Sequence, residues 1–157
     1  VRKHSRKPGY QALHVAIDDH SRVGFSLMLA DETVKSAIVF VFAALRYYRA
    51  LGVRVMRIMT DNGSAYRSKK FAKLLRRLKI KHVRTRPYTP RTNGKAERFI
   101  QTLLAEWAYG TFHRSNHSRL AALPRWVDFY NHRRPHTALD GQVPMDVLVN
   151  DVCGNYN

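Results

Sequence analysis

Apolar stretches with strand spacing alternate along this chain with stretches that have the spacing of amphipathic helices. Residues 12–17 are β-prone and are followed by turn residues and a second apolar run at 23–29, which together predict a hairpin. Apolar side chains recur three and four positions apart, as on one face of a helix, at residues 34–48, 71–78 and 96–107. This alternation of strands and helices predicts an α/β domain with a mixed sheet and flanking helices.

Local signals set the expected limits of the elements. Thr33 is placed to cap the helix that follows it, and Gly52 is placed to end that helix. Short apolar runs predict strands at residues 53–59 and 82–85, and a further helix is expected from about Arg119 to Asn131. The stretch at 86–94 holds two prolines and a glycine, so we expect a loop there.

The length and apolar content of the chain bound its organisation. With 157 residues, 45% of them apolar, we expect one domain over residues 1–157. Residues 1–9 predict a basic arm, and residues 140–157 predict an irregular C-terminal tail packed against the core. The single cysteine, Cys153, excludes an intrachain disulfide, and no apolar run is long enough to span a membrane. A cytoplasmic location is the expectation.

The charge balance is strongly positive. The chain has 28 Lys and Arg against 11 Asp and Glu, for a formal net charge of +17. The positive residues are spread along the whole chain and not gathered in a tail, so a polyanion is the expected partner. Nucleic acid is favoured over a membrane surface or a purely structural use of the charge.

Two acidic residues occupy positions suited to a metal site. Asp61 directly follows a predicted strand, and the carboxyl ends of strands are where α/β sheets bind ligands. At 100° per residue, Glu97 lies on the rim of the apolar stripe of its predicted helix, where a rigid element can hold it beside a cleft. Each acid alone also fits an ordinary turn or a solvated helix flank. Their combination favours a functional pair.

Three motifs resemble the catalytic core of bacterial insertion-sequence transposases and retroviral integrases. They are TDNGSAYRS at 60–68, RPYTPRTNGKAERFIQTL at 86–103 and YNHRRPHTAL at 130–139. In that family a T-D-N-G aspartate and a glutamate 35 intervening residues later are two of three catalytic acids. Asp61 and Glu97 have this spacing. The resemblance extends over nearly the whole chain.

The resemblance implies a fold, a reaction and a cofactor. The fold would be ribonuclease H-like, with a mixed five-stranded sheet between helices. The reaction would be DNA cleavage and strand transfer in transposition or integration, by a homodimer or larger assembly on DNA. Asp61 and Glu97 would be catalytic and would bind two Mg²⁺ or Mn²⁺ ions, since carboxylate oxygens suit these hard cations.

The loop before Glu97 supplies the expected DNA contacts. Tyr88 and Asn93 are candidates to touch sugar and base, and three basic side chains are candidates to hold phosphates: Arg91, Lys95 and Arg98. Asn93 and Lys95 are favoured most because they flank the predicted helix of Glu97. Each of these residues is also an ordinary surface group.

The first of the family's three acids has no counterpart. That acid belongs to a strand that precedes the hairpin, and nothing acidic precedes Asp18 in this chain. We therefore expect the first strand to be missing, which would leave two sheet edges exposed. Three explanations stay open: the chain is part of a longer reading frame, which we favour; it is a decayed remnant; or Asp18 replaces the lost ligand.

Two alternative functions are considered beside the enzyme. One is a catalytically inactive DNA-binding remnant of the same fold. The other is a small basic RNA-binding protein, which would have no reason to hold two acids at this spacing.

Overall fold

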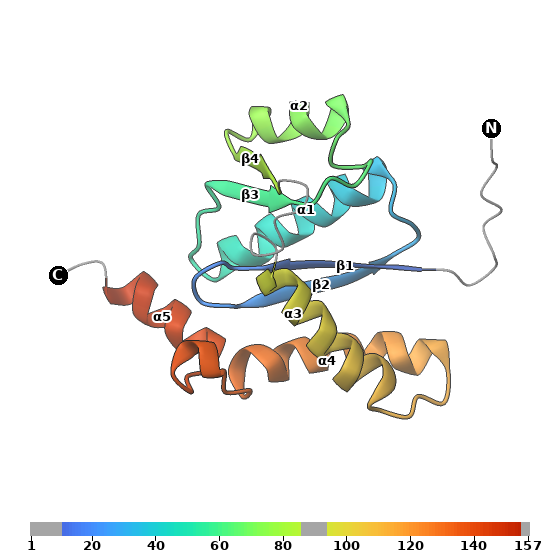
Figure 1. Ribbon diagram of the computed structural model, residues 1–157, viewed down its shortest axis with the longest axis vertical. Coiled ribbons are helices and arrows are strands. Elements are labelled where there is room, and N and C mark those ends of the chain that lie inside the picture. Colours follow the sequence, from blue (N-terminus) through green and yellow to red (C-terminus); the bar gives the residue numbers. More distant parts are fainter. Residues whose placement is uncertain (1–10, 86–93, 155–157) are drawn as a thin grey trace.

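The computed structural model describes residues 11–85 and 94–154, and Figure 1 shows their arrangement. The N-terminal part comprises strand β1 (Ala12–Ile17), strand β2 (Gly24–Leu29) and helix α1 (Val34–Ala50). Strand β3 (Arg57–Thr60), helix α2 (Lys69–Arg77) and strand β4 (Lys81–Arg84) follow. The C-terminal part is helical, with α3 (Gly94–Leu103), α4 (Asn116–His132) and α5 (Pro144–Gly154). The mixed α/β class is confirmed.

The predicted hairpin is present, and helices cover both of its faces. β1 and β2 pair antiparallel, from Ala12 opposite Leu29 to Ile17 opposite Gly24. Because side chains alternate along a strand, Leu13, Val15 and Ile17 pack with α3 and α4. On the other face, Phe25 stacks on Phe40 of α1. The hairpin is thus the middle layer between α1 and the α3–α4 pair (Figure 1).

A second ladder carries the chain to Asp61. β3 and β4 pair parallel, with Arg57 opposite Lys81 and Thr60 opposite Arg84. Phe71 and Leu75 of α2 are fully buried against Ala37 and Val41 of α1, so one side of α2 faces the core. Helix α1 therefore packs against both ladders and connects them through its side chains.

The predicted five-stranded sheet is not formed by the described residues. Their four strands make two separate ladders, β1 with β2 and β3 with β4. No described strand joins the two, although α1 packs on both (Figure 1). Backbone pairing links the carboxyl end of β3 to β4 alone, so only half of the expected sheet supports Asp61.

The strand before Asp61 is shorter than its apolar run indicates. Pairing with β4 begins only at Arg57, and Val53 and Val55 instead pack against a cluster that includes Leu148 of α5. A hydrophobic partner outside the sheet has taken up the first half of the run. Gly52 ends α1 with φ of +81°, as predicted. Thr33 is the N-cap residue, but its side chain makes no capping hydrogen bond.

The expectation of an irregular C-terminal tail is wrong for residues 144–154, which form α5. Pro144 fits the first position of a helix, where its missing N–H costs nothing. Leu148 of α5 is buried with Val23, Ala44 and Tyr48. The predicted basic arm at residues 1–9 lies outside the described residues. No helix in the described ranges is long and apolar enough to cross a membrane.

Candidate metal centre and DNA-binding residues

Asp61 lies in a loop whose backbone holds one of its carboxylate oxygens. Its Oδ1 accepts a hydrogen bond of 2.8 Å from the N–H of Gly63. Asn62 donates its side-chain amide to the carbonyl of Thr85 at 2.7 Å, which ties this loop to the end of β4. The Asp61 side chain is exposed at the carboxyl end of β3, where the sequence predicted a ligand position. This geometry fixes one oxygen and leaves the other free of backbone contacts among the described residues.

The surroundings of Asp61 are partly aromatic. A Cβ on Gly63 would lie 3.0 Å from Oδ1 of Asp61 and 3.4 Å from the ring of Tyr66, so the three groups pack closely. Burial raises the pKa of the Tyr66 hydroxyl, and the charges of Asp61 and Glu32 raise it further. The Tyr66 hydroxyl therefore stays neutral at physiological pH.

Glu97 lies in the first turn of α3 and is exposed. Phe99, two residues further on, is buried among Leu103, Trp107 and Tyr130, so the apolar stripe of this helix is fixed to the core. This matches the predicted position on the rim of an apolar stripe. Among the described residues, neither Asp61 nor Glu97 forms an ion pair with a basic side chain. Both carboxylates are therefore open to solvent and available to a cation.

Lys95 does not have a free ammonium group. Its Nζ forms an ion pair with Oδ1 of Asp19 and also donates to the carbonyl of Asp19 at 2.9 Å. Asp19 belongs to the turn between β1 and β2, so this pair links the start of α3 to the hairpin. The hydrogen bond from Lys95 holds the pKa of the Asp19 carboxyl below its ordinary value. Lys95 thus anchors the helix that carries Glu97.

Replacing Lys95 with Met should raise the pKa of the Asp19 carboxyl toward the ordinary value of an aspartate. The main cause of the lowered pKa, a charged hydrogen bond, would be gone. An NMR titration of the side-chain carboxyl carbons measures this directly. Lys70→Met, at an exposed position on α2, is the matched control and should leave the Asp19 titration unchanged. An unshifted Asp19 pKa in Lys95→Met would contradict the anchoring role.

Asp18 is engaged within its own turn. Its Oδ2 accepts hydrogen bonds of 2.8 Å from both the backbone N–H and the hydroxyl of Ser21. These contacts stabilise the β1–β2 turn, and the alternative that Asp18 replaces the family's first acid stays a prediction. In the described ranges, 11–85 and 94–154, no group of three or more His, Cys, Asp and Glu side chains is placed to hold a metal ion.

Of the other predicted DNA contacts, one lies within the described residues and three lie outside them. Arg98 is exposed on α3. Tyr88, Arg91 and Asn93 lie in 86–93, outside the described residues, and their roles stay predictions.

Comparison with known proteins decides the family. Two family profiles described as integrase core domain match the chain, one over residues 3–90 and the other over residues 78–144. The first covers more than half of the chain. This chain belongs to the integrase core domain family. Membership of this family places the chain with the transposases and integrases of DNA transposition and integration.

Curated relatives include both retroviral and bacterial proteins. This integrase core is 36% identical over 93 residues to the Pol-related polyprotein of mouse intracisternal A-particle MIA14. That match covers 59% of the chain and 10% of the polyprotein. It is 28% identical over 99 residues to transposase InsD of Escherichia coli insertion element IS2A/D/F/H/I/K, which covers 63% of the chain and 33% of the transposase. The chain thus spans less than half the length of these relatives.

Solved structures show the same fold. The catalytic core domain of HTLV-2 integrase, solved in a dimeric form with magnesium, superposes with a TM-score of 0.62 at 22% sequence identity. The match covers 93% of this chain and 90% of that one. The ribonuclease H-like class expected from the motifs is therefore supported at the level of the fold.

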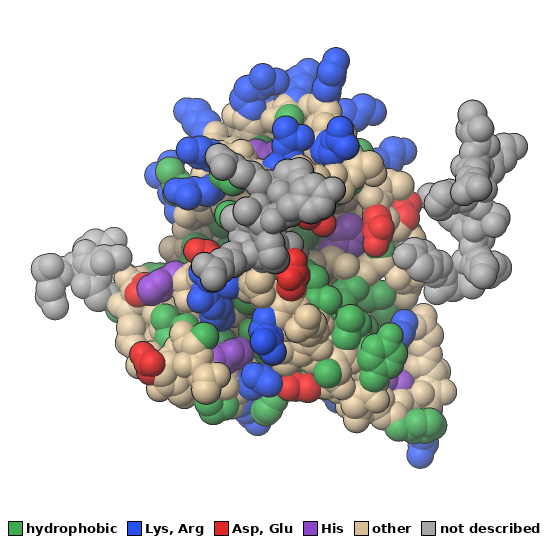
Figure 2. Space-filling view, in the orientation of Figure 1, with side chains coloured by type: hydrophobic (Ala, Val, Ile, Leu, Met, Phe, Trp, Pro, Cys, Tyr) green, Lys and Arg blue, Asp and Glu red, His purple; other side chains and the backbone are tan. Residues whose placement is uncertain are grey.

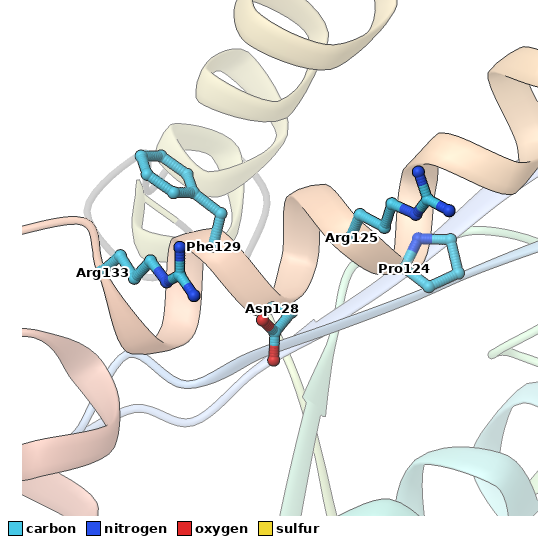
Figure 3. Close-up of a pocket in the computed structure, with 5 residues that line it drawn as sticks. All are labelled: Pro124, Arg125, Asp128, Phe129 and Arg133. Atoms are coloured by element: carbon cyan, nitrogen blue, oxygen red, sulfur yellow. The ribbon is translucent and has the colours of Figure 1, made fainter.

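A shallow, largely open cavity of about 440 Å³ lies elsewhere on this integrase core, along α4. Figure 3 shows its lining: Pro124, Arg125, Asp128, Phe129 and Arg133. The Asp128 carboxylate lies 3.1 Å from His132 on the same helix. None of the predicted catalytic or DNA-binding residues lines this cavity, so it is separate from the candidate metal centre.

One buried residue was not singled out from the sequence. Asn131 of α4 accepts a hydrogen bond from the N–H of Gly24 and donates to its carbonyl, both at 2.8 Å. It also donates to the hydroxyl of Tyr47 at 3.0 Å. Asn131 lies inside the 130–139 motif, so the motif was the available signal, but spacing alone gave it no role. Its side chain joins α4 to the start of β2 and to α1.

Proposed function

We propose that this integrase core cleaves DNA phosphodiester bonds and transfers the cut strand, with Asp61 and Glu97 as its metal ligands. One observation carries the proposal: both carboxylates are exposed on fixed elements and have no basic partner among the described residues. Other exposed acids, such as Asp140 and Asp146, also lack a basic partner among the described residues. What distinguishes Asp61 and Glu97 is that they also stand at the two acidic positions of the integrase-like motifs.

The donor set suits Mg²⁺ or Mn²⁺. Asp61 and Glu97 offer only oxygen atoms, which these hard cations prefer over nitrogen or sulfur ligands. Such ions, bound in a pair, activate the attacking oxygen and stabilise the leaving one at a phosphodiester. The hydrogen bond from Gly63 fixes the rotamer of Asp61, and the burial of Phe99 fixes the helix of Glu97.

The same proposal assigns residues that contact DNA and an oligomeric state of the protein on DNA. Arg98 and the 86–93 loop residues Tyr88, Arg91 and Asn93 would contact the DNA beside the acids. Lys95 would act through the position of α3, because its ammonium group is paired with Asp19. Two DNA ends must be joined, so the active form would be at least a homodimer.

A second candidate function is a DNA-binding remnant without catalysis. The observation that favours it is the missing third acid among the described residues, where no cluster of three metal-ligating side chains occurs. The remnant would bind DNA through its positive surface but would not bind divalent metal at Asp61.

Metal removal separates these two functions. We expect this chain to bind Mn²⁺, with paramagnetic broadening of backbone NMR signals centred on Asp61 and Glu97, and to nick supercoiled plasmid DNA when Mn²⁺ is present. EDTA should abolish both effects and leave DNA binding intact, because that binding depends on Lys and Arg. Broadening without nicking would leave the metal ligands supported and the reaction of this chain refuted. Absence of both would favour the remnant.

A further inference from the structure

The exposed side of α2 carries a dense set of positive charges. Five of the nine residues of this helix are Lys or Arg, and another lysine follows its end. These exposed residues form what we call the α2 ridge: Lys69, Lys70, Lys73, Arg76, Arg77 and Lys79. Figure 2 shows Lys and Arg side chains gathered at the end of the molecule where Figure 1 places α2. Phe71 and Leu75 are buried on the opposite side of the helix, so the ridge points to solvent.

No acidic residue compensates this charge locally. The sequence from Asn62 to Ala96 has 12 Lys and Arg and no Asp or Glu. Among the described residues, no member of the α2 ridge forms an ion pair. The positive potential of the ridge is therefore available to a partner.

The arrangement is unfavourable for the helix itself. Lys69, Lys73 and Arg77 repeat at intervals of four, which places like charges side by side on the helix surface. Lys69 and Lys70 occupy the first turn, where the helix dipole favours acidic side chains and none is present. A ridge that served only solubility could alternate charges at lower cost. Its composition indicates a polyanion as partner.

We propose that the α2 ridge binds the phosphate backbone of double-stranded DNA without reading its sequence. The ridge has no aromatic side chain on which unpaired bases could stack, and such platforms are typical of single-strand binding. Its Lys and Arg side chains suit phosphate oxygens, and contacts to phosphate carry no sequence information. At 1.5 Å per residue the helix is about 13 Å long, comparable to the major groove width of about 12 Å, so basic side chains can reach phosphates on both strands.

The ridge is a binding surface additional to the acids. Asp61 follows β3, whereas the ridge lies on the exposed side of α2, after the loop that follows Asp61. Strand transfer joins two DNA molecules, so a second duplex-binding surface has a place in the proposed function. The choice of DNA as the polyanion rests on that proposed function, whereas the phosphate-binding role of the ridge rests on its charge.

The test compares two variants of equal charge. Lys70→Gln, Lys73→Gln and Arg77→Gln are combined in the ridge variant, and Arg49→Gln, Arg125→Gln and Arg133→Gln in the control. All six positions are exposed. Affinity for a 30-base-pair DNA of random sequence is measured by fluorescence anisotropy between 50 and 200 mM salt, in EDTA. The ridge variant should lose roughly 100-fold in affinity near 0.1 M salt, and its log–log salt slope should be shallower by about 2 to 3, at about 0.9 per phosphate.

The control variant and the other nucleic acids decide whether the α2 ridge is a specific surface for duplex DNA. The logarithm of the DNA affinity should fall in the control variant by less than about a third of its fall in the ridge variant. Equal losses of affinity in both variants would overturn the proposal, because DNA binding would then depend only on the net charge of the protein. Tighter binding of single-stranded DNA or of duplex RNA, with the same dependence on the ridge, would overturn the choice of duplex DNA. Because the assay contains no divalent metal, ridge-dependent binding would stand even if nicking were absent. The ridge variant should unfold at an unchanged or higher temperature, since it relieves repulsion.

Discussion

Replacing Asp61 with Asn should lower metal-dependent nicking by at least about 100-fold, and so should replacing Glu97 with Gln. Even the outer partners of metal ligands change metal affinity or activity by about 10–100-fold, so a direct ligand should have no smaller effect. Both replacements keep the shape of the side chain and remove only its charge, and both positions are exposed, so folding should be unaffected. The measurement is the initial rate of plasmid nicking in Mn²⁺, with the Mn²⁺-induced NMR broadening as a second readout independent of turnover.

Asp140→Asn is the matched control. Asp140 is exposed and left-handed, with φ of 53°, a conformation that asparagine tolerates well. This variant removes the same unit of negative charge and should nick DNA and bind Mn²⁺ as the parent chain does. The two site variants should keep full DNA affinity, because they make the protein more positive. Parental Mn²⁺ broadening in Asp61→Asn or Glu97→Gln would remove that residue from the metal centre.

Replacing Asn131 with Ala should lower the free energy of unfolding by about 2–4 kcal/mol. The change leaves the buried N–H and carbonyl of Gly24 without their partner, and each unsatisfied buried group costs about 1–3 kcal/mol. The expected fall in melting temperature is about 5–15 °C, at about 2–4 °C per kcal/mol for a protein of this size. Urea denaturation followed by circular dichroism measures the loss.

Asn150→Ala provides the control for Asn131→Ala. Asn150 is exposed in α5, so the same substitution there gains helix propensity and breaks no buried hydrogen bond. It should change stability by less than about 1 kcal/mol in either direction. A loss below 1 kcal/mol in Asn131→Ala would show that water replaces the amide and that the α4 to β2 connection is not the source of stability.

The Asn131 contact also bears on the position of Glu97. A Cβ on Gly24 would come within 2.6 Å of the Phe99 ring, so β2 accepts α3 at this distance only because residue 24 is glycine. Asn131 holds the backbone of that same glycine. The packing of Phe99, two residues from Glu97, therefore depends on α4. Loss of the Asn131 side chain should therefore also disturb the helix that carries Glu97.

Much of the fold could be predicted from local patterns. The hairpin, α1 with its end at Gly52 and the stripe of Phe99, Leu103 and Trp107 follow from side-chain periodicity, which a buried face imposes on each element separately. The family was predicted from the motifs containing Asp61 and Glu97, and the family profiles confirm it. The roles of these two acids stay proposals.

Contacts between distant segments were not predictable in this way. Val53 and Val55 form an apolar run typical of a strand, but they pack against the buried cluster that contains Tyr48 and Leu148 instead of pairing with β4. The C-terminal helix was missed because two prolines and a glycine dominate its surroundings, whereas burial of Leu148 stabilises it. The ion pair of Lys95 with Asp19 of the hairpin turn was likewise not predictable, and the role of Lys95 as a phosphate contact stays a prediction.

The sequence by itself determined the family, the positive charge and the two acids proposed to hold metal, because motif spacing and composition do not depend on how the chain packs. Only the tertiary structure decided which groups meet. It paired Lys95 with Asp19, clamped Gly24 with Asn131, left Asp61 and Glu97 open and divided the described strands into two ladders. Those outcomes depend on residues up to 107 positions apart, and no local pattern specifies such pairings.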